Sequence, residues 1–279
     1  MTSKGIITLI VVLVLIALGG YGVYYYNQQN TNNGYSSNGT QGKIIFGIKD
    51  AAASMGNITS VMLTIDNAQL HSATDGWVTL SNDAHEFDLL ALKQAGQIGL
   101  IATSDVNAGT YDQMRLSVSK IIIVENGGAQ QEAKLPSGEL KISGNVVVNS
   151  DATATTVFDF IADESLHVTG NGKYIFTPVI HLETRSNATA SIDQNSKVTI
   201  SGGTVEVSSK VGMDVNGEVK ESFSLDSDVT LDLVGNIIKV TSKDEKSASV
   251  KVNAAAASNT AVTQGYLDTA ISMQLITQD

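Results

Sequence analysis

The chain has 279 residues, no cysteine and a net charge of −11, with only 17 lysines and arginines. The lack of cysteine excludes disulfides, thiolate metal sites and thiol catalysis. The scarcity of basic residues excludes the basic stripe with which proteins bind nucleic acid phosphates. The length is sufficient for two domains that are stabilised by packing alone.

An uncharged, apolar segment occupies residues 5–26. As a helix it would be about 33 Å long, enough to cross a hydrocarbon core of about 30 Å. Lys4 precedes it and the next basic residue is Lys43, which predicts a cytoplasmic N-terminus and an extracellular body. We therefore predict that residues 1–26 form a single-pass anchor in the cell membrane, with membrane lipid as its partner.

Two other interpretations of this segment stay open. Ala17-Leu18-Gly19 is a small-x-small site at which a signal peptidase would remove the segment. Lys4-Gly5-Ile6-Ile7 resembles the processing site of archaeal prepilins, which leaves the hydrophobic helix on the mature subunit. Residues 27–42 are polar, uncharged and rich in Asn, Ser and Gly, which predicts a flexible tether.

The body that follows alternates apolar and polar residues with a period of two, as in strands that have one face on a core. The clearest runs are Val61, Leu63 and Ile65; Val198 and Ile200; Val205 and Val207; Val211, Met213 and Val215; and Val229, Leu231 and Leu233. Tight hairpins are predicted where Asn or Asp precedes Gly. These positions are Asp75-Gly76, Asn126-Gly127, Asn171-Gly172 and Asn216-Gly217.

One short helix is predicted, over residues 87–95, with the Asp88 carboxylate at its positive end. The small, polar stretch 186–196 predicts a boundary between a first β-sandwich domain at 43–185 and a smaller β domain at 190–279. The expected fold class is all-β, with two β-sandwich-like domains behind one N-terminal transmembrane helix and a flexible tether.

No group of residues in the sequence matches a catalytic, cofactor or metal motif. The four histidines are scattered, and no nucleophile elbow, phosphate loop or dinucleotide fingerprint occurs. The nearby carboxylates Asp159, Asp163 and Glu164 lack the aromatic cleft of a glycosidase. The aspartates at 226, 228 and 232 lack the spacing of a calcium loop, and Asp214-Val-Asn216-Gly217 is interpreted as a hairpin. We expect no enzyme activity, no cofactor and no metal.

Two residues are candidates for weak ligand contact. Trp77, the only tryptophan, is interpreted as a partly buried core residue at a hairpin base, with a stacking platform for a sugar as the alternative. For Arg115 a structural salt bridge with Asp50, Asp159 or Asp163 is expected, and recognition of a ligand carboxylate is the alternative.

Three Asn-x-Thr sequons make glycosylation sites of an exported chain in cells that modify them. They are centred on Asn38, Asn57 and Asn187.

An ordered series of short motifs resembles the domain-of-unknown-function 4382 family of bacterial and archaeal surface proteins over residues 43–185. The motifs are IIFGIKDA at 44–51, GWVTL at 76–80, DLLAL at 88–92, GTYDQMRL at 109–116, FDF at 158–160 followed by Ser165, and PVI at 178–180. The chain departs from the family at Ala52, where proline is usual, and at Thr177, where lysine is frequent. The resemblance implies an exported β-sandwich without an established activity.

These features predict a membrane-anchored extracellular structural or interaction protein that presents its β domains at the cell surface. Its expected partners are itself or other surface proteins. One alternative is a filament or pilus subunit assembled by β-strand complementation, with residues 43–50 as a donor strand. The other is a module that binds a glycan or a small ligand through Trp77.

Overall fold

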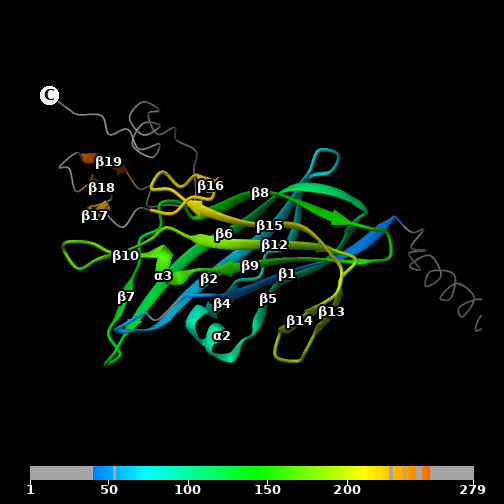
Figure 1. Cartoon of the computed structure of the whole chain (residues 1–279), viewed down its shortest axis with the longest axis horizontal. Helices are drawn as coiled ribbons and strands as arrows, with labels where there is room; N and C mark the ends of the chain where they lie inside the picture. Colours follow the sequence, from blue (N-terminus) through cyan, green and yellow to red (C-terminus); the bar gives the residue numbers. More distant parts are fainter. Residues whose placement is uncertain (1–39, 53–54, 226–228, 236, 243–246, 252–279) are drawn as a thin grey trace, which may run out of the picture. The chain divides into compact units, whose positions relative to one another are not determined.

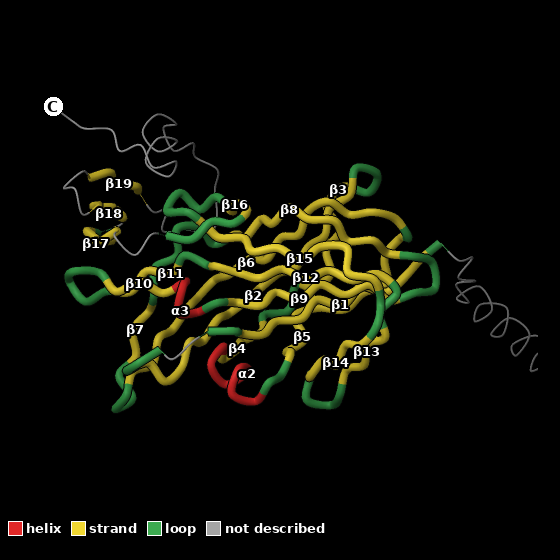
Figure 2. The backbone as a smooth tube through the Cα atoms, in the orientation of Figure 1, coloured by secondary structure: helices red, strands yellow, loops and turns green. Residues whose placement is uncertain are grey.

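The computed structural model describes residues 40–52, 55–225, 229–235, 237–242 and 247–251. Residues 1–39, which contain the predicted anchor and most of the predicted tether, lie outside this part. Among the residues it describes, neither helix is long and apolar enough to cross a membrane. The described chain is an all-β structure with two short helices (Figures 1 and 2).

The larger sheet has eight strands in the order β13-β14-β5-β1-β9-β12-β15-β16. Their bounds, in chain order, are β1 Gln41–Asp50, β5 Ile98–Asn107, β9 Thr153–Phe160, β12 Val179–Ser186, β13 Thr189–Ile192, β14 Lys197–Ser201, β15 Thr204–Met213 and β16 Val219–Glu221.

The second sheet has six strands in the order β3-β2-β6-β7, with β4 also paired to β2 and β8 also paired to β6. Their bounds are β2 Ile58–Ser72, β3 Gly76–Ser81, β4 His85–Asp88, β6 Gly109–Glu125, β7 Gln130–Glu132 and β8 Glu139–Val148.

Two smaller sheets and two helices complete the described elements. They are the pair β10 Leu166–Val168 and β11 Tyr174–Phe176, the three-stranded sheet β17 Val229–Val234, β18 Ile237–Ser242 and β19 Ser247–Lys251, and the helices α2 Leu89–Ala95 and α3 Ala162–Ser165.

The two large sheets pack face to face around one apolar core. Phe46 and Phe158 from the eight-stranded sheet meet edge to face, with ring centroids 5.2 Å apart. Leu63 of β2 and Leu116 of β6 join the same cluster from the other sheet and are fully buried. Because both inner faces contribute to one core, residues 40–221 form a β-sandwich.

A glycine lets the sheets come close together at one point. A Cβ atom on Gly144 of β8 would lie 3.1 Å from Leu182 Cδ2 of the opposite sheet and 3.2 Å from Met114 Cε. These distances are shorter than an ordinary van der Waals contact, so a larger residue here would force the core side chains to move.

The predicted alternation is confirmed most clearly in β2. Val61, Leu63 and Ile65 are buried, whereas Met62 and Thr64 between them are only partly covered. The alternation is weaker in β15, where Val205 is 44% exposed.

All four predicted hairpins are present, linking β2 to β3, β6 to β7, β10 to β11 and β15 to β16. The glycines of these turns have positive φ angles, as the turn chemistry requires: Gly76, Gly127, Gly172 and Gly217.

The predicted helix begins two residues later than expected, at Leu89. Phe87 instead belongs to β4, which pairs with β2. Asp88 is the N-cap, and its Oδ1 accepts hydrogen bonds from the N–H groups of Leu90 and Ala91. The Asp88 cap therefore determines where the helix starts, and the residues before Leu89 form strand β4 instead.

Strand β1 lies in the middle of the large sheet. It pairs antiparallel with β5 and parallel with β9, and its Ile44, Phe46 and Ile48 are fully buried. Both edges of this strand are therefore occupied within the chain itself. Residues 43–50 do not form a free donor strand in this structure, contrary to what the filament hypothesis assumed.

The eight-stranded sheet continues across the boundary predicted at 186–196. On one side of it lies β12, which pairs with β15 on the other side over residues 179–186. Strand β14 pairs with β5 of the predicted first domain. Small polar residues at 186–196 mark turns around the short hairpin β13–β14, and that hairpin belongs to the sandwich.

A second, smaller apolar cluster joins β17–β18 to the end of the sandwich. It contains Ile175, Val215, Leu231 and Ile238. The loop between β10 and β11 is also bonded to β17, since Gly170 N–H donates to Asp232 Oδ1.

Candidate functional site

The outer face of the six-stranded sheet carries the two residues predicted for ligand contact. Neighbouring strands β3, β2, β6 and β8 place Trp77 opposite His71, and Arg115 opposite Lys141. Residues on either side of these, such as Leu70 and Leu116, face the core. We call His71, Trp77, Arg115 and Lys141 the Trp77 cluster.

Basic side chains surround the indole ring of Trp77. The Arg115 guanidinium lies 4.1 Å from the ring centroid, and Lys141 Nζ lies 5.8 Å from it. The His71 ring is 5.0 Å away and tilted by 53°. A cation over an indole face is attracted by the quadrupole of the ring, so these contacts hold Arg115 across β2.

Arg115 is poorly matched with acceptors. Its Nη1 donates one long bond of 3.5 Å to Gln69 Oε1, and the nearest carboxylate, that of Glu139, is 3.8 Å away. Its Nε is buried and has no hydrogen-bond partner in the described part of the chain. The expected salt bridge to Asp50 or Asp159 is not made, because Arg115 lies on the opposite sheet and points outward.

Trp77 is half-buried at the base of the β2–β3 hairpin, as predicted, but it lies on the outer face and not in the core. Its neighbour Val78 packs on the core instead. Beside it, His71 Nδ1 is 2.6 Å from Asp112 Oδ1, which fixes the orientation of the imidazole. Polar side chains rather than apolar ones therefore border the indole ring of Trp77, which is only partly covered.

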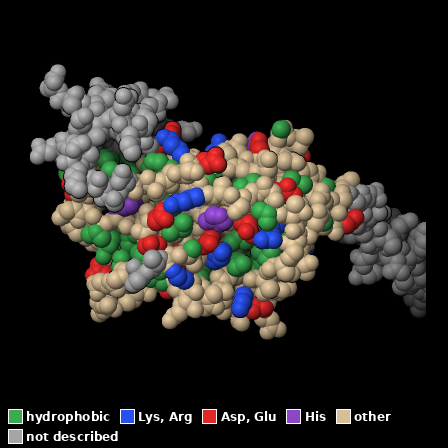
Figure 3. Space-filling view, in the orientation of Figure 1, with side chains coloured by type: hydrophobic (Ala, Val, Ile, Leu, Met, Phe, Trp, Pro, Cys, Tyr) green, Lys and Arg blue, Asp and Glu red, His purple; other side chains and the backbone are tan. Residues whose placement is uncertain are grey.

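The outer face of the eight-stranded sheet is different, since its charged side chains are matched with each other. Figure 3 shows acidic and basic side chains interleaved over this face. Lys49 pairs with Asp159 at 2.8 Å, and Arg185 pairs with Glu183 at 2.7 Å. Lys210 pairs with Glu164. The carboxylates considered for glycosidase chemistry are thus engaged in ion pairs or other interactions.

A buried carboxylate lies at the end of β1. Asp50 is 6% exposed, and its Oδ1 accepts a hydrogen bond from Ala162 N–H at 3.1 Å. Burial raises the pKa of Asp50 to about 6, and the nearby Asp159 adds to the rise. Its hydrogen bond to Ala162 links β1 to α3, so its evident role is structural.

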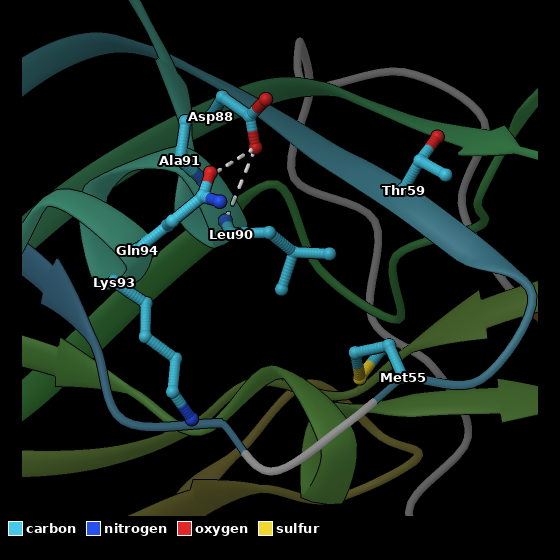
Figure 4. Close-up of a pocket in the computed structure, with 7 residues that line it drawn as sticks. All are labelled: Met55, Thr59, Asp88, Leu90, Ala91, Lys93 and Gln94. Atoms are coloured by element: carbon cyan, nitrogen blue, oxygen red, sulfur yellow. Dashed lines mark hydrogen bonds between the residues drawn. The ribbon is translucent and has the colours of Figure 1, made fainter.

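A shallow hollow of about 480 Å³ lies beside α2 (Figure 4). Its charged lining residues are both engaged: Asp88 caps the helix, and Lys93 Nζ donates to the carbonyl of Ala51 at 3.2 Å. Leu90 and Met55 point toward its interior (Figure 4). With neither a free nucleophile nor a free acid–base pair among these residues, the hollow offers no catalytic arrangement.

The aspartates considered for calcium have structural roles where the structure describes them. Asp214 Oδ1 accepts from the N–H groups of Asn216 and Glu218, and Oδ2 lies 2.8 Å from Lys220 Nζ, so this carboxylate stabilises the predicted hairpin. Residues 226 and 228 lie outside the described part. Within that part, no group of three or more His, Cys, Asp or Glu side chains is placed to hold a metal ion.

Two of the three sequons can be located. Asn57 is exposed just before β2, and Asn187 is exposed in the turn between β12 and β13 with a positive φ of 51°. The side chain of Asn187 accepts a hydrogen bond from Asn149 at 3.0 Å. Asn38 lies outside the described residues.

The fold of the described residues places the protein in the class of all-β, sandwich-like proteins. Residues 41–178 match the family model described as Domain of unknown function (DUF4382), and this part of the chain belongs to that family. Comparison of the whole chain with curated proteins and with solved structures gave no significant match.

Sequence reasoning named Trp77 and Arg115 but missed His71, Lys141 and Glu139. The outward position of Lys141 between the apolar Leu140 and Ile142 is visible in the sequence. Its position opposite Arg115 depends on the register of β8 against β6, which shifts between Tyr111 and Gln113. That irregularity leaves no local signal from which the pairing could be read.

Proposed function

We propose that the chain is a non-catalytic interaction protein of the cell surface, anchored in the membrane by residues 5–26 and exposing its β-sandwich outside. The observation that carries this proposal is the long uncharged segment with Lys4 before it and no further basic residue before Lys43.

The proposal includes a two-part body. The sandwich spans residues 40–221, and the sheet β17–β19 begins a smaller second unit. The support for this division is that β17–β19 form a sheet of their own, which contacts the sandwich through the small apolar cluster around Leu231 and Ile238. The membrane anchor and the tether complete the arrangement as the sequence predicts it.

The absence of cysteine makes the topology directly testable, because any introduced cysteine is the only thiol in the chain. We would make Ser3→Cys, Ser36→Cys and Thr74→Cys, the last in the exposed β2–β3 turn. A membrane-impermeant maleimide should label positions 36 and 74 on intact cells, and position 3 only after permeabilisation.

Labelling of position 74 only after lysis would contradict an extracellular body. Intact mass of the purified protein separates the three fates of the N-terminus. A mass that lacks only the first few residues would support prepilin processing, and a mass that lacks the whole apolar segment would support a cleaved signal peptide.

A second candidate function is recognition of a small ligand or glycan on the outer face of the six-stranded sheet. The observation that favours it is the contact between Trp77 and Arg115, which sequence analysis had named independently. Titration of candidate sugars against the intact chain, followed by the fluorescence of its single tryptophan, would test it. Unchanged fluorescence with every sugar would contradict it.

A further inference from the structure

Two positive side chains face each other across neighbouring strands in the Trp77 cluster. Arg115 of β6 and Lys141 of β8 are direct partners in the antiparallel register. Like charges placed directly opposite each other destabilise a sheet. The chain has a net charge of −11 and only 17 basic residues, so its composition alone does not lead one to expect two basic side chains side by side. Its cost would be removed by an anion that lies between the two side chains.

The hydrogen-bonding capacity of Arg115 points the same way. A guanidinium has five N–H donors in a planar fork, and it matches a carboxylate with two parallel bonds. Here only the long bond to Gln69 and the distant Glu139 are available, and Nε has no partner among the described residues. The side chain is 24% exposed, so part of the fork can still be reached from outside.

Lys141 adds a second unmatched charge. In the described part of the chain, no carboxylate lies within 4.0 Å of its Nζ, and its one assigned contact is with the Trp77 ring. The ion pairs on the other sheet have separations of 2.8 Å or less for Lys49, Arg185 and Lys210. Carboxylates thus lie close beside these three basic side chains of the eight-stranded sheet, whereas the described part offers Arg115 and Lys141 only the long contacts of Arg115 with Gln69 and Glu139.

The surroundings suit a sugar that carries the anion. Trp77 offers apolar ring surface beside the two cations, and Gln113 and Ser143 lie in the next row of the same face, where an amide and a hydroxyl can bond sugar hydroxyls. Asp112 is already bound to His71, which leaves Glu139 as the carboxylate that competes for Arg115.

We propose that the Trp77 cluster binds an acidic saccharide, with Arg115 and Lys141 holding a uronate carboxylate and Trp77 contacting the sugar ring. This inference rests on the second candidate function, ligand recognition at this face, and does not depend on membrane anchoring. Arg115 supplies the paired donors and Lys141 supplies a second charge on the opposite side of the anion.

The single tryptophan is a built-in reporter for this site. Trigalacturonate should change the fluorescence of Trp77 in the full chain in a saturable way, at concentrations up to about 1 mM. Its fully methyl-esterified form has nearly the same shape but no charge, and it should bind about tenfold more weakly or not detectably. Raising the salt concentration should weaken binding of the acid form only, because screening acts on charge.

Four variants test the roles of the residues. Arg115→Gln and Lys141→Gln should each weaken binding of trigalacturonate by about tenfold or more. Glu139→Gln should strengthen it about two- to fivefold, because it removes the competing carboxylate. Lys120→Gln is the matched control, since Lys120 is an exposed lysine further along β6 without an ion pair in the described part, and it should leave binding unchanged.

Two results would overturn the proposal in distinguishable ways. If the acid and the ester bind equally and Arg115→Gln has no effect, the cluster recognises a ligand but does not recognise its carboxylate. No fluorescence change and no calorimetric heat with either form would remove ligand recognition as well. Thermal unfolding of each variant shows whether it is folded, and the exposed Lys141 provides a test even if Arg115→Gln is unstable.

Discussion

Two buried ionisable groups respond to acid in opposite directions. Burial raises the pKa of Asp50 to about 6, and burial lowers the pKa of His167 to about 4. The imidazole of His167 is held by Thr177, with Nε2 and Oγ1 2.8 Å apart. Because both groups titrate between pH 4 and pH 6.5, their contributions to the pH dependence of the stability should largely cancel in this range.

Replacing Asp50 with Asn removes one of these two titrating groups, so the contribution of Asp50 to the stability can be measured. The folded pKa of Asp50 is above its unfolded value of 3.8, so the folded state binds the proton more tightly. Ionised Asp50 therefore costs stability that grows from about pH 4 and is complete above about pH 6. Asp50→Asn should be more stable than the parent by about 2 kcal/mol at pH 7, and the difference should vanish near pH 4.

Urea unfolding at several pH values between 4 and 7 measures this difference. A constant gap across the range would mean that the carboxylate does not titrate as its burial implies. Asp83→Asn is the matched control, because Asp83 is an exposed aspartate in the loop before β4.

His167→Gln should act in the opposite sense. The folded pKa of His167 lies below 6.5, so the parent loses stability as pH falls from about 6.5 to about 4 while the unfolded chain takes up the proton. The variant lacks this loss. Relative to the parent, it should therefore gain about 2 kcal/mol between pH 7 and pH 4 in the same urea experiment. If the stability of His167→Gln relative to the parent instead fell toward acid pH, burial would not lower the pKa of His167.

At the scale of the element, the cap of α2 should account for most of the local stability of this short helix. Asp88→Ala removes the side-chain acceptor for two N–H groups and should cost about 1 kcal/mol in the free energy of unfolding. Asp83→Ala removes a carboxylate from a nearby exposed loop and serves as the control. Equal stability of the two variants would argue against a stabilising cap.

The strands differ in how far the sequence could predict them. Alternation found β2, because Val61, Leu63 and Ile65 face a core while the residues between them face outward. It could not place β1 at the centre of a sheet, because β1 pairs in parallel with β9, a strand more than 100 residues later. All four hairpins could be predicted from their turn residues, because a positive φ angle depends on the residue in the turn itself and not on distant parts of the chain.

The candidate site shows the same limit. Trp77 and Arg115 attract notice as rare residue types, yet their contact crosses β2 and depends on pairing in three strands. A structural salt bridge was expected for Arg115, and the structure places Glu139 beside it, not the expected Asp50 or Asp159. Sequence does not reveal which sheet, or which face, a strand residue occupies. Lys141 became relevant only once the register of β8 was known.

At the scale of the whole molecule, Gly144 marks a point where the two sheets come close together. Gly144→Ala should destabilise the sandwich by about 1 to 2 kcal/mol, because the new methyl group presses on Leu182 and Met114. Gly109→Ala is the matched control, since a Cβ there meets nothing within 4 Å. Urea unfolding compares them, and equal midpoints would show that the core has room at Gly144.

Truncation tests where the sandwich ends. A fragment of residues 40–225 keeps every strand of both large sheets and should unfold cooperatively. A fragment of residues 40–185 ends at the boundary that the sequence predicted, and it lacks β13 to β16. The second fragment should be aggregated or unfolded, because β12 would lose its partner β15 and expose its edge. A well-folded 40–185 fragment would support the domain boundary that the sequence predicts at 186–196.

The central position of β1 has a mechanical consequence. A force applied at Gln41 along this strand acts on the hydrogen bonds to β5 and to β9 at the same time, since both partners extend along it over residues 43–48. Those bonds would have to break together, by shear, whereas an edge strand can be peeled away one bond at a time. The strand nearest the predicted tether therefore resists being pulled out through hydrogen bonds on both of its edges.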